Sequence, residues 1–312
     1  MSIAEDGRRE RKSTAGRYRP AMEIRERQIE TATLSTGLLE CGPADGPLVV
    51  CVHGFPDSAH TWRHLLPRLA EAGFRAVAPF QRGYAPTSVP ADGRYQTGVL
   101  AQDMNMLHEA LGGGGDAVII GHDWGAPATY GAAVLGPERW RKVVGLAVPP
   151  GPAFGMSLVT NLVQLKRSWY MFFFQSPFAD MVVPANDMAY IDMLWADWSP
   201  GYDASHDLPL VKAALGDPAN LAAALGYYRA ALGDGFKDPT LEAEQAAAGA
   251  VPTQPTLYLH GRDDGGIGPE VAELAATMTP PNVTVEIVDH AGHFLQLEQA
   301  ELVNARILEF LG

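Results

Sequence analysis

The chain is poor in cysteine and in basic charge, and it lacks any long apolar run. Two cysteines among 312 residues offer no disulfide framework, which favours a reducing compartment, and we expect a cytoplasmic protein. A formal net charge of −13 argues against a nucleic-acid partner. No apolar segment approaches the roughly 18 residues that a membrane helix needs, so we expect no membrane partner. The first 27 residues also lack the apolar centre of a signal peptide.

Residues 1–23 mix charges of both signs and hold few large apolar side chains. Such a segment cannot bury enough apolar surface to offset the loss of chain entropy on folding. We therefore expect a disordered leader here. From about residue 24 the pattern changes.

Beyond the leader, strand patterns alternate with helix patterns. The continuous apolar runs at residues 48–52 and 117–120 are typical of strands that are buried on both faces. The alternation predicts an α/β fold, with a mostly parallel sheet flanked by helices, over residues 24–150 and 246–312. The other predicted strands cover residues 24–31, 32–40, 74–79, 142–148, 256–260 and 284–288, and the predicted helices cover 60–72, 97–111 and 295–311.

Residues 151–245 interrupt this rhythm. They are rich in aromatic residues and proline, and they read as helices over 158–175, 188–195, 208–215 and 221–232. We interpret them as a helical cap inserted between two strands of the core.

The most informative motif is Gly121-His122-Asp123-Trp124-Gly125, which follows a buried strand and precedes a stretch of small residues. Strand, G-x-nucleophile-x-G and helix together form the nucleophile elbow of α/β-hydrolases. Most elbows carry serine, whereas this one presents Asp123. A carboxylate is already an anion and suits displacement at a saturated carbon, which leaves an ester on the enzyme. The motif therefore favours opening of an epoxide or expulsion of a halide over acyl transfer.

A carboxylate nucleophile needs an oxyanion hole, a base and an acid that orients the base. The backbone N–H groups of Phe55, in a loop after a buried strand, and Trp124 form the expected oxyanion pair. His293, just before the last helix, is the candidate base, with His290 as a rival. The acid follows the strand at 256–260, where Asp263 and Asp264 are adjacent. No carboxylate follows the strand at 142–148, which strengthens that location.

From about residue 30 onward the chain resembles the epoxide hydrolases of the α/β-hydrolase fold. The resemblance rests on the elbow, on His53-Gly54-Phe55-Pro56, on Gln81-Arg82-Gly83-Tyr84 and on Gly292-His293. It implies that Asp264 is the acid, with Asp263 in reserve. It also implies that two cap tyrosines, Tyr170 and Tyr228, hydrogen-bond the epoxide oxygen. The chain departs from the family pattern at Phe80 and at Ala85-Pro86-Thr87-Ser88, which puts the local loop shape in question.

The sequence thus predicts an epoxide hydrolase that makes a vicinal diol from a small-molecule epoxide and water, with no metal or organic cofactor. Aromatic cap residues suggest an aryl or polycyclic epoxide as substrate, contacted by Trp169, Phe173 and Trp195. A homodimer is compatible with the sequence. One alternative is a haloalkane dehalogenase, although Phe55 stands where that family carries a halide-binding Asn, and Trp124 where a fluoroacetate dehalogenase carries Arg. The other alternative is a hydrolase-fold protein that only binds a ligand.

Overall fold

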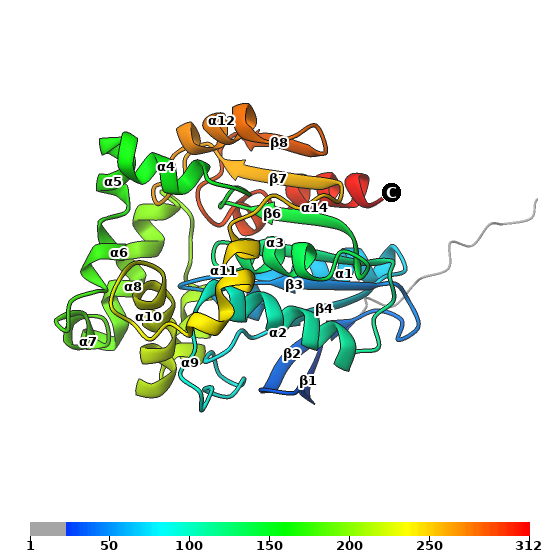
Figure 1. Ribbon diagram of the computed structural model, residues 1–312, viewed down its shortest axis with the longest axis horizontal. Helices are drawn as coiled ribbons and strands as arrows, with labels where there is room; N and C mark the ends of the chain where they lie inside the picture. The colour runs from blue at the N-terminus through cyan, green and yellow to red at the C-terminus, as the bar shows by residue number, and fades with distance from the viewer. Residues whose placement is uncertain (1–22) are drawn as a thin grey trace, which may run out of the picture.

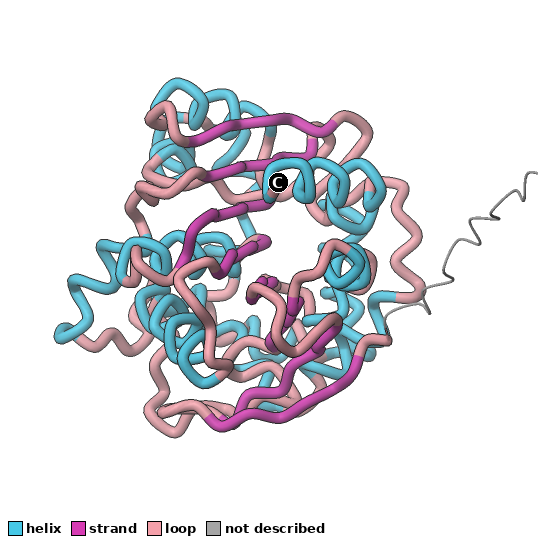
Figure 2. Tube along the Cα trace, turned by 90° about the vertical axis from the view of Figure 1, so that its right-hand side faces the viewer, coloured by secondary structure: helices cyan, strands magenta, loops and turns pink. Residues whose placement is uncertain are grey.

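The computed structural model describes residues 23–312, so the predicted leader lies outside the described residues except for Glu23. Eight strands form one sheet in the order β1-β2-β4-β3-β5-β6-β7-β8 (Figure 1). Strand β2 pairs antiparallel with both β1 and β4, and all other pairs are parallel, which confirms the predicted mostly parallel sheet. The strands are β1 (Arg25–Glu30), β2 (Ser35–Cys41), β3 (Leu48–Val52), β4 (Arg75–Pro79), β5 (Ala117–His122), β6 (Trp140–Leu146), β7 (Thr256–Gly261) and β8 (Val283–Val288). The strands turn progressively across the sheet (Figure 2).

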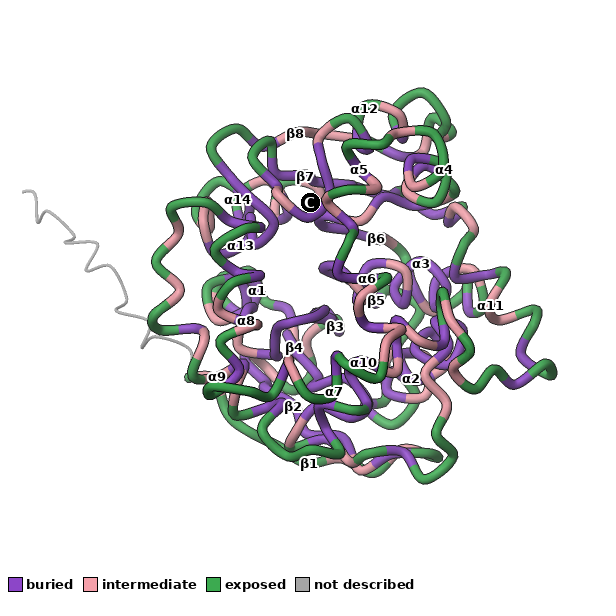
Figure 3. The backbone as a smooth tube through the Cα atoms, turned by 90° about the vertical axis from the view of Figure 1, so that its left-hand side faces the viewer, coloured by how far each residue is buried: buried purple, intermediate pink, exposed green. Residues whose placement is uncertain are grey.

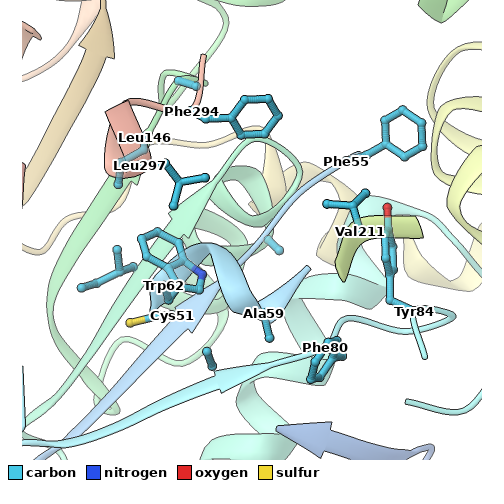
Figure 4. Packing of buried hydrophobic residues seen from close by; sticks show 14 of the residues in the cluster. Cys51, Phe55, Ala59, Trp62, Phe80, Tyr84, Leu146, Val211, Phe294 and Leu297 are labelled. Atoms are coloured by element: carbon cyan, nitrogen blue, oxygen red, sulfur yellow. The ribbon is translucent and has the colours of Figure 1, made fainter. Parts of the chain in front are cut away.

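Helices cover both faces of the sheet, as the continuous apolar strands require. Alternate residues of β3 enter different cores: Val49 and Cys51 pack in one cluster, Val50 and Val52 in the other. Figure 4 shows the first cluster, in which Cys51 lies beside Trp62. Cys51 is therefore a fully buried residue that packs as a small apolar side chain. The covering helices are η1 (Ala59–Trp62), α1 (Leu65–Glu71), α2 (Thr97–Ala110), α3 (Gly125–Leu135), α12 (Pro269–Met278), α13 (Leu295–Glu298) and α14 (Ala300–Leu311).

A helical segment lies between β6 and β7, beyond the carboxyl ends of the parallel strands (Figure 1). Its last helix packs against α2 and α3 of the core. The division into a core and a cap at residues 151–245 remains a prediction. The segment contains α4 (Ala153–Thr160), α5 (Leu162–Arg167), α6 (Trp169–Phe173), α7 (Ala179–Val182), α8 (Ala185–Trp198), α9 (Asp207–Leu215), α10 (Pro218–Leu232), η2 (Pro239–Leu241) and α11 (Glu242–Ala248).

The prediction of one helix over residues 158–175 is wrong, because the chain forms α4, α5 and α6 there. Asn161 has extended backbone angles, φ −120° and ψ 103°, and its side chain accepts hydrogen bonds from Val163 N and Gln164 N. These are the properties of a helix N-cap, so a new helix begins at that point. The predicted helix 60–72 is likewise divided into η1 and α1, and the helix 295–311 is interrupted at Gln299.

Among residues 23–312, no helix is long and apolar enough to cross a lipid bilayer.

Candidate active site

Asp123 stands at the sharp turn between β5 and α3. Its backbone φ of 49° lies in the left-handed region, as the sharp turn of a nucleophile elbow requires. The turn is crowded on both sides. A Cβ at Gly121 would lie 2.2 Å from Gly125 O, and a Cβ at Gly125 would lie 2.2 Å from Val52 O. Glycine is therefore required at both positions for the turn to close.

The Asp123 carboxylate is held from two directions. The backbone N–H of Phe55 donates to Oδ1 over 2.7 Å, and His293 Nε2 lies 3.6 Å from Oδ2. The neighbouring Gly54 has no room for a side chain, because a Cβ there would lie 2.4 Å from Asp123 Cβ. Trp124 is the N-cap residue of α3, so its backbone N–H lies outside the helical hydrogen-bond pattern. One carboxylate oxygen is thus anchored, and the other faces the imidazole.

His293 and Asp264 form a buried pair. Imidazole Nδ1 lies 2.8 Å from Asp264 Oδ2, and Asp264 Oδ1 accepts 2.8 Å hydrogen bonds from the N–H groups of Gly266 and Ile267. The rivals Asp263 and His290 are both exposed at the surface. The structure therefore brings Asp264 and His293 to Asp123, and it does not bring Asp263 or His290 there.

The two carboxylates dominate the charge state of His293. Burial alone would lower the pKa of this imidazole, but the charge of Asp264 and the contacts with both carboxylates raise it to about 10. Burial would raise the pKa of the Asp264 carboxyl, but the charge and hydrogen bond of His293 bring it below its usual value. Between the two carboxylates, His293 is therefore an imidazolium at neutral pH.

Tyr170 on α6 and Tyr228 on α10 line the same cavity as Asp123, which has a volume of about 290 Å³. Their rings lie 5.8 Å apart between centroids. Both are buried, and burial, together with the nearby Asp123 carboxylate, raises the pKa of each phenol well above its usual value. The Tyr228 hydroxyl makes no hydrogen bond of normal geometry with any described residue. Two protonated phenols thus share a largely apolar cavity with the carboxylate.

The three aromatic residues predicted to contact substrate do not line this cavity. Trp169 is 43 % exposed, and Phe173 stacks on Tyr190 at 5.5 Å between centroids. Trp195 donates through Nε1 to Pro56 O over 2.7 Å, which links α8 to the loop after β3. The aromatic lining comes instead from Phe154, with Trp124 and the two tyrosines.

Sequence reasoning missed a supporting role of His122, the residue before Asp123. Its Nε2 lies 2.9 Å from the backbone carbonyl of His293, and the ring is fully buried. Burial, and then the charge of His293, lower the pKa of His122 to about 3, so the ring is neutral and donates this hydrogen bond from Nε2. The elbow motif itself contains this histidine, but only the fold shows that it contacts the base.

Among the described residues, no group of three or more His, Cys, Asp or Glu side chains is placed to hold a metal ion.

Comparison with known proteins places this arrangement in a family. Residues 47–300 match the family model of the alpha/beta hydrolase fold. The chain belongs to the α/β-hydrolase fold family. An epoxide hydrolase of Caballeronia sordidicola is 31 % identical, over 92 % of this chain and 94 % of that protein. Within the fold family, the chain is an epoxide hydrolase.

Solved structures agree with this assignment. Epoxide hydrolase A from Mycobacterium thermoresistibile is 30 % identical, covers 93 % of this chain and 98 % of its own, and superposes with a TM-score of 0.73. A variant of an epoxide hydrolase from Bacillus megaterium, complexed with its product (R)-3-[1]naphthyloxy-propane-1,2-diol, is 26 % identical with a TM-score of 0.75. This match covers 91 % of our chain and 99 % of the Bacillus megaterium chain.

Proposed function

We propose that this enzyme opens its epoxide in two steps through an ester on Asp123. The observation that carries the proposal is the meeting of Asp123, Tyr170 and Tyr228 in one apolar cavity. A carboxylate supplies the nucleophile, and two neutral phenols supply hydrogen bonds to the oxygen that becomes negative as the ring opens.

In the first step, Asp123 Oδ2 attacks an epoxide carbon while Phe55 N–H retains Oδ1. The carbon–oxygen bond of the ring breaks, and a phenol of Tyr170 or Tyr228 transfers its proton to the alkoxide. Esterification removes the negative charge of Asp123. One of the two carboxylates that raise the pKa of His293 is then lost, and the imidazolium releases the proton that restores the phenol.

In the second step, neutral His293 accepts a proton from water, and the resulting hydroxide attacks the ester carbonyl. The N–H groups of Phe55 and Trp124 stabilise the tetrahedral oxyanion. Asp264 holds Nδ1–H, so that Nε2 faces the water. Collapse releases the vicinal diol and regenerates the Asp123 carboxylate and the imidazolium. The sum is one epoxide and one water converted to one diol.

Oxygen tracing tests the ester directly. A single turnover with enzyme in excess, in water enriched in heavy oxygen, should give unlabelled diol and a heavy oxygen in the peptide that carries Asp123. Direct attack of water on the epoxide would place the label in the diol instead.

The variant Asp123→Asn should form no diol while remaining folded, because an amide is nearly isosteric with a carboxylate but a poor nucleophile. Diol formation by that variant, after deamidation is excluded, would contradict the proposal.

We further propose an aryl epoxide as substrate. The cavity is lined by Phe154 and Trp124 as well as by the tyrosines, and aromatic rings gain from stacking and edge contacts with one another. The diol bound to the Bacillus megaterium relative also carries an aryl group. A cytoplasmic location and a homodimer stay predictions from the sequence.

A further inference from the structure

The first part of the helical segment exposes an unusual concentration of large apolar side chains. Eight large apolar residues in the described chain are about half exposed or more, and six of these lie between residues 159 and 181. We call these six the cap apolar patch: Val159, Leu162, Val163, Phe172, Phe178 and Met181. They come from α4 to α7, which lie together along one edge of the molecule in Figure 1 and face the viewer in Figure 3.

The segment that carries the patch is almost free of charge. Lys166, Arg167 and Asp180 are the only ionic residues from position 151 to 182, whereas 19 % of the whole chain is charged. Arg167 pairs with Glu270, and Asp180 pairs with Arg229. The whole chain has a net charge of −13, but this segment holds only one acidic residue, Asp180, so the segment itself adds little repulsion from a phosphate-bearing surface.

Helix α4 connects the patch with the active-site cavity. Helix α4 contributes Gly155 and Leu158 to the cavity lining, while Met156 and Val159 of the same helix are exposed to solvent. Leu232, at the end of α10, both lines the cavity and is 42 % exposed. An apolar substrate can therefore pass from the patch into the cavity without crossing a charged rim.

We propose that the cap apolar patch docks this enzyme on a lipid surface, from which it draws apolar epoxides. Large exposed apolar patches mark interaction sites, and proteins that lie on a bilayer interface insert apolar side chains shallowly into it. A second copy of the chain seated on the patch would cover the entrance beside α4, whereas a lipid surface supplies substrate there. Shallow docking requires no membrane-spanning helix, so the lack of a long apolar run, from which we expected no membrane partner, does not argue against it.

Flotation with phosphatidylcholine vesicles tests the proposal. The wild-type enzyme should float with the vesicles, and Val159→Gln/Leu162→Gln/Met181→Gln should reduce the bound fraction at least tenfold. A matched control, Leu302→Gln/Met278→Gln/Leu135→Gln, changes three exposed apolar residues outside the patch and should float like the wild type. None of these six residues lines the cavity, so turnover of a dissolved epoxide should be unchanged in both variants.

Three results would overturn lipid docking. The first is wild-type enzyme that stays at the bottom of the gradient. The second is equal loss of flotation in the control and patch variants. The third is a lipid-free dimer that becomes a monomer only in the patch variant, which would assign the patch to a second copy of the chain. Asp123→Asn should float normally, so failure of the proposed ester mechanism leaves this test intact.

Discussion

The hydroxyl of Tyr227 donates a 2.8 Å hydrogen bond to the backbone carbonyl of Arg82. Seven residues earlier on the same helix, Asn220 Nδ2 donates over 2.7 Å to Gly83 O. The Arg82 side chain is itself buried and paired with Asp103 through two hydrogen bonds. Helix α10 is therefore fixed to a rigid loop of the core at two points, and the next residue along the helix, Tyr228, lines the cavity.

Tyr227→Phe should slow the alkylation step by roughly tenfold, because a shift of α10 moves the Tyr228 hydroxyl from its place opposite Asp123. The variant also leaves Arg82 O without a partner, which should lower the free energy of unfolding by about 1–3 kcal/mol. Pre-steady-state alkylation rates and denaturant unfolding measure the two effects. Tyr202→Phe, which removes a cap hydroxyl bonded to Asp207, is the control and should alter stability alone. Equal alkylation rates in the two variants would exclude positioning by Tyr227.

Asp264→Asn should slow ester hydrolysis by roughly two to four orders of magnitude, because the imidazole loses the carboxylate that fixes its tautomer. Asp263→Asn should have little effect, since Asp263 is exposed and Asp264 is the residue that lies 2.8 Å from His293. Single-turnover decay of the ester intermediate measures the ranking. The opposite ranking would move the acid to Asp263.

The centre of the sheet could be predicted from the sequence because strands such as β3 and β5 are buried on both faces. The apolar run at 117–120 and the glycines around Asp123 are local signals that survive in the structure as β5 and the elbow. The order of nucleophile, acid and histidine along the chain could also be predicted from the sequence. Resemblance to a family, rather than composition or spacing, distinguished Asp264 from Asp263.

The helical segment was harder to predict, because its breaks depend on single side chains. The side chain of Asn161 caps α5 at its start, and Gln164 Nε2 donates to Ser168 Oγ where α5 ends. Apolar periodicity carries neither signal. Helix α12 was not predicted, although Gly268-Pro269 before Val271 and Ala272 is a helix-start signal. Which aromatic rings face the cavity follows from those breaks, so Trp169 was expected at the substrate and lies at the surface.

His293→Gln should complete alkylation and then stop, so that the intact protein keeps the mass of the substrate. The absence of an adduct under saturating epoxide would remove His293 as the base.

The same variant also tests how the charged His293 interacts with Asp123 and Asp264. The folded-state pKa of His293, about 10, exceeds the ordinary value of 6.5, so the stabilisation is full below about pH 6.5 and is lost as the pH rises toward 10. Between these two pH values, the Tm of the wild type should therefore fall more steeply than the Tm of His293→Gln. Parallel plots of Tm against pH would contradict the raised pKa.

Tyr170→Phe and Tyr228→Phe should each slow alkylation by roughly 10- to 100-fold, and the double variant by at least about 10⁴-fold. One remaining phenol still stabilises the alkoxide in part, whereas none leaves it unpaired in an apolar cavity. Rapid-quench measurement of ester formation separates this effect from ester hydrolysis. If the double variant forms the ester at the wild-type rate, a haloalkane dehalogenase becomes the alternative again. A test for halide release from haloalkanes would then decide between the two activities.

The aryl preference can be tested at Phe154, the one phenylalanine in residues 23–312 that lines the cavity. The ratio of kcat/KM for styrene oxide to that for propylene oxide should exceed about 10 in the wild type, because an aryl group gains roughly 0.5–1.5 kcal/mol from each aromatic contact beyond the burial of its area. Phe154→Leu keeps the wall apolar and removes the ring, so this ratio should fall several-fold. Trp169→Leu removes an aromatic residue that lies outside the cavity lining and should leave the ratio unchanged. An effect of Trp169→Leu larger than that of Phe154→Leu would restore Trp169 as the substrate contact that the sequence predicts. Equal values of kcat/KM for the two epoxides in the wild-type enzyme would show that the aromatic residues of the cap serve packing alone.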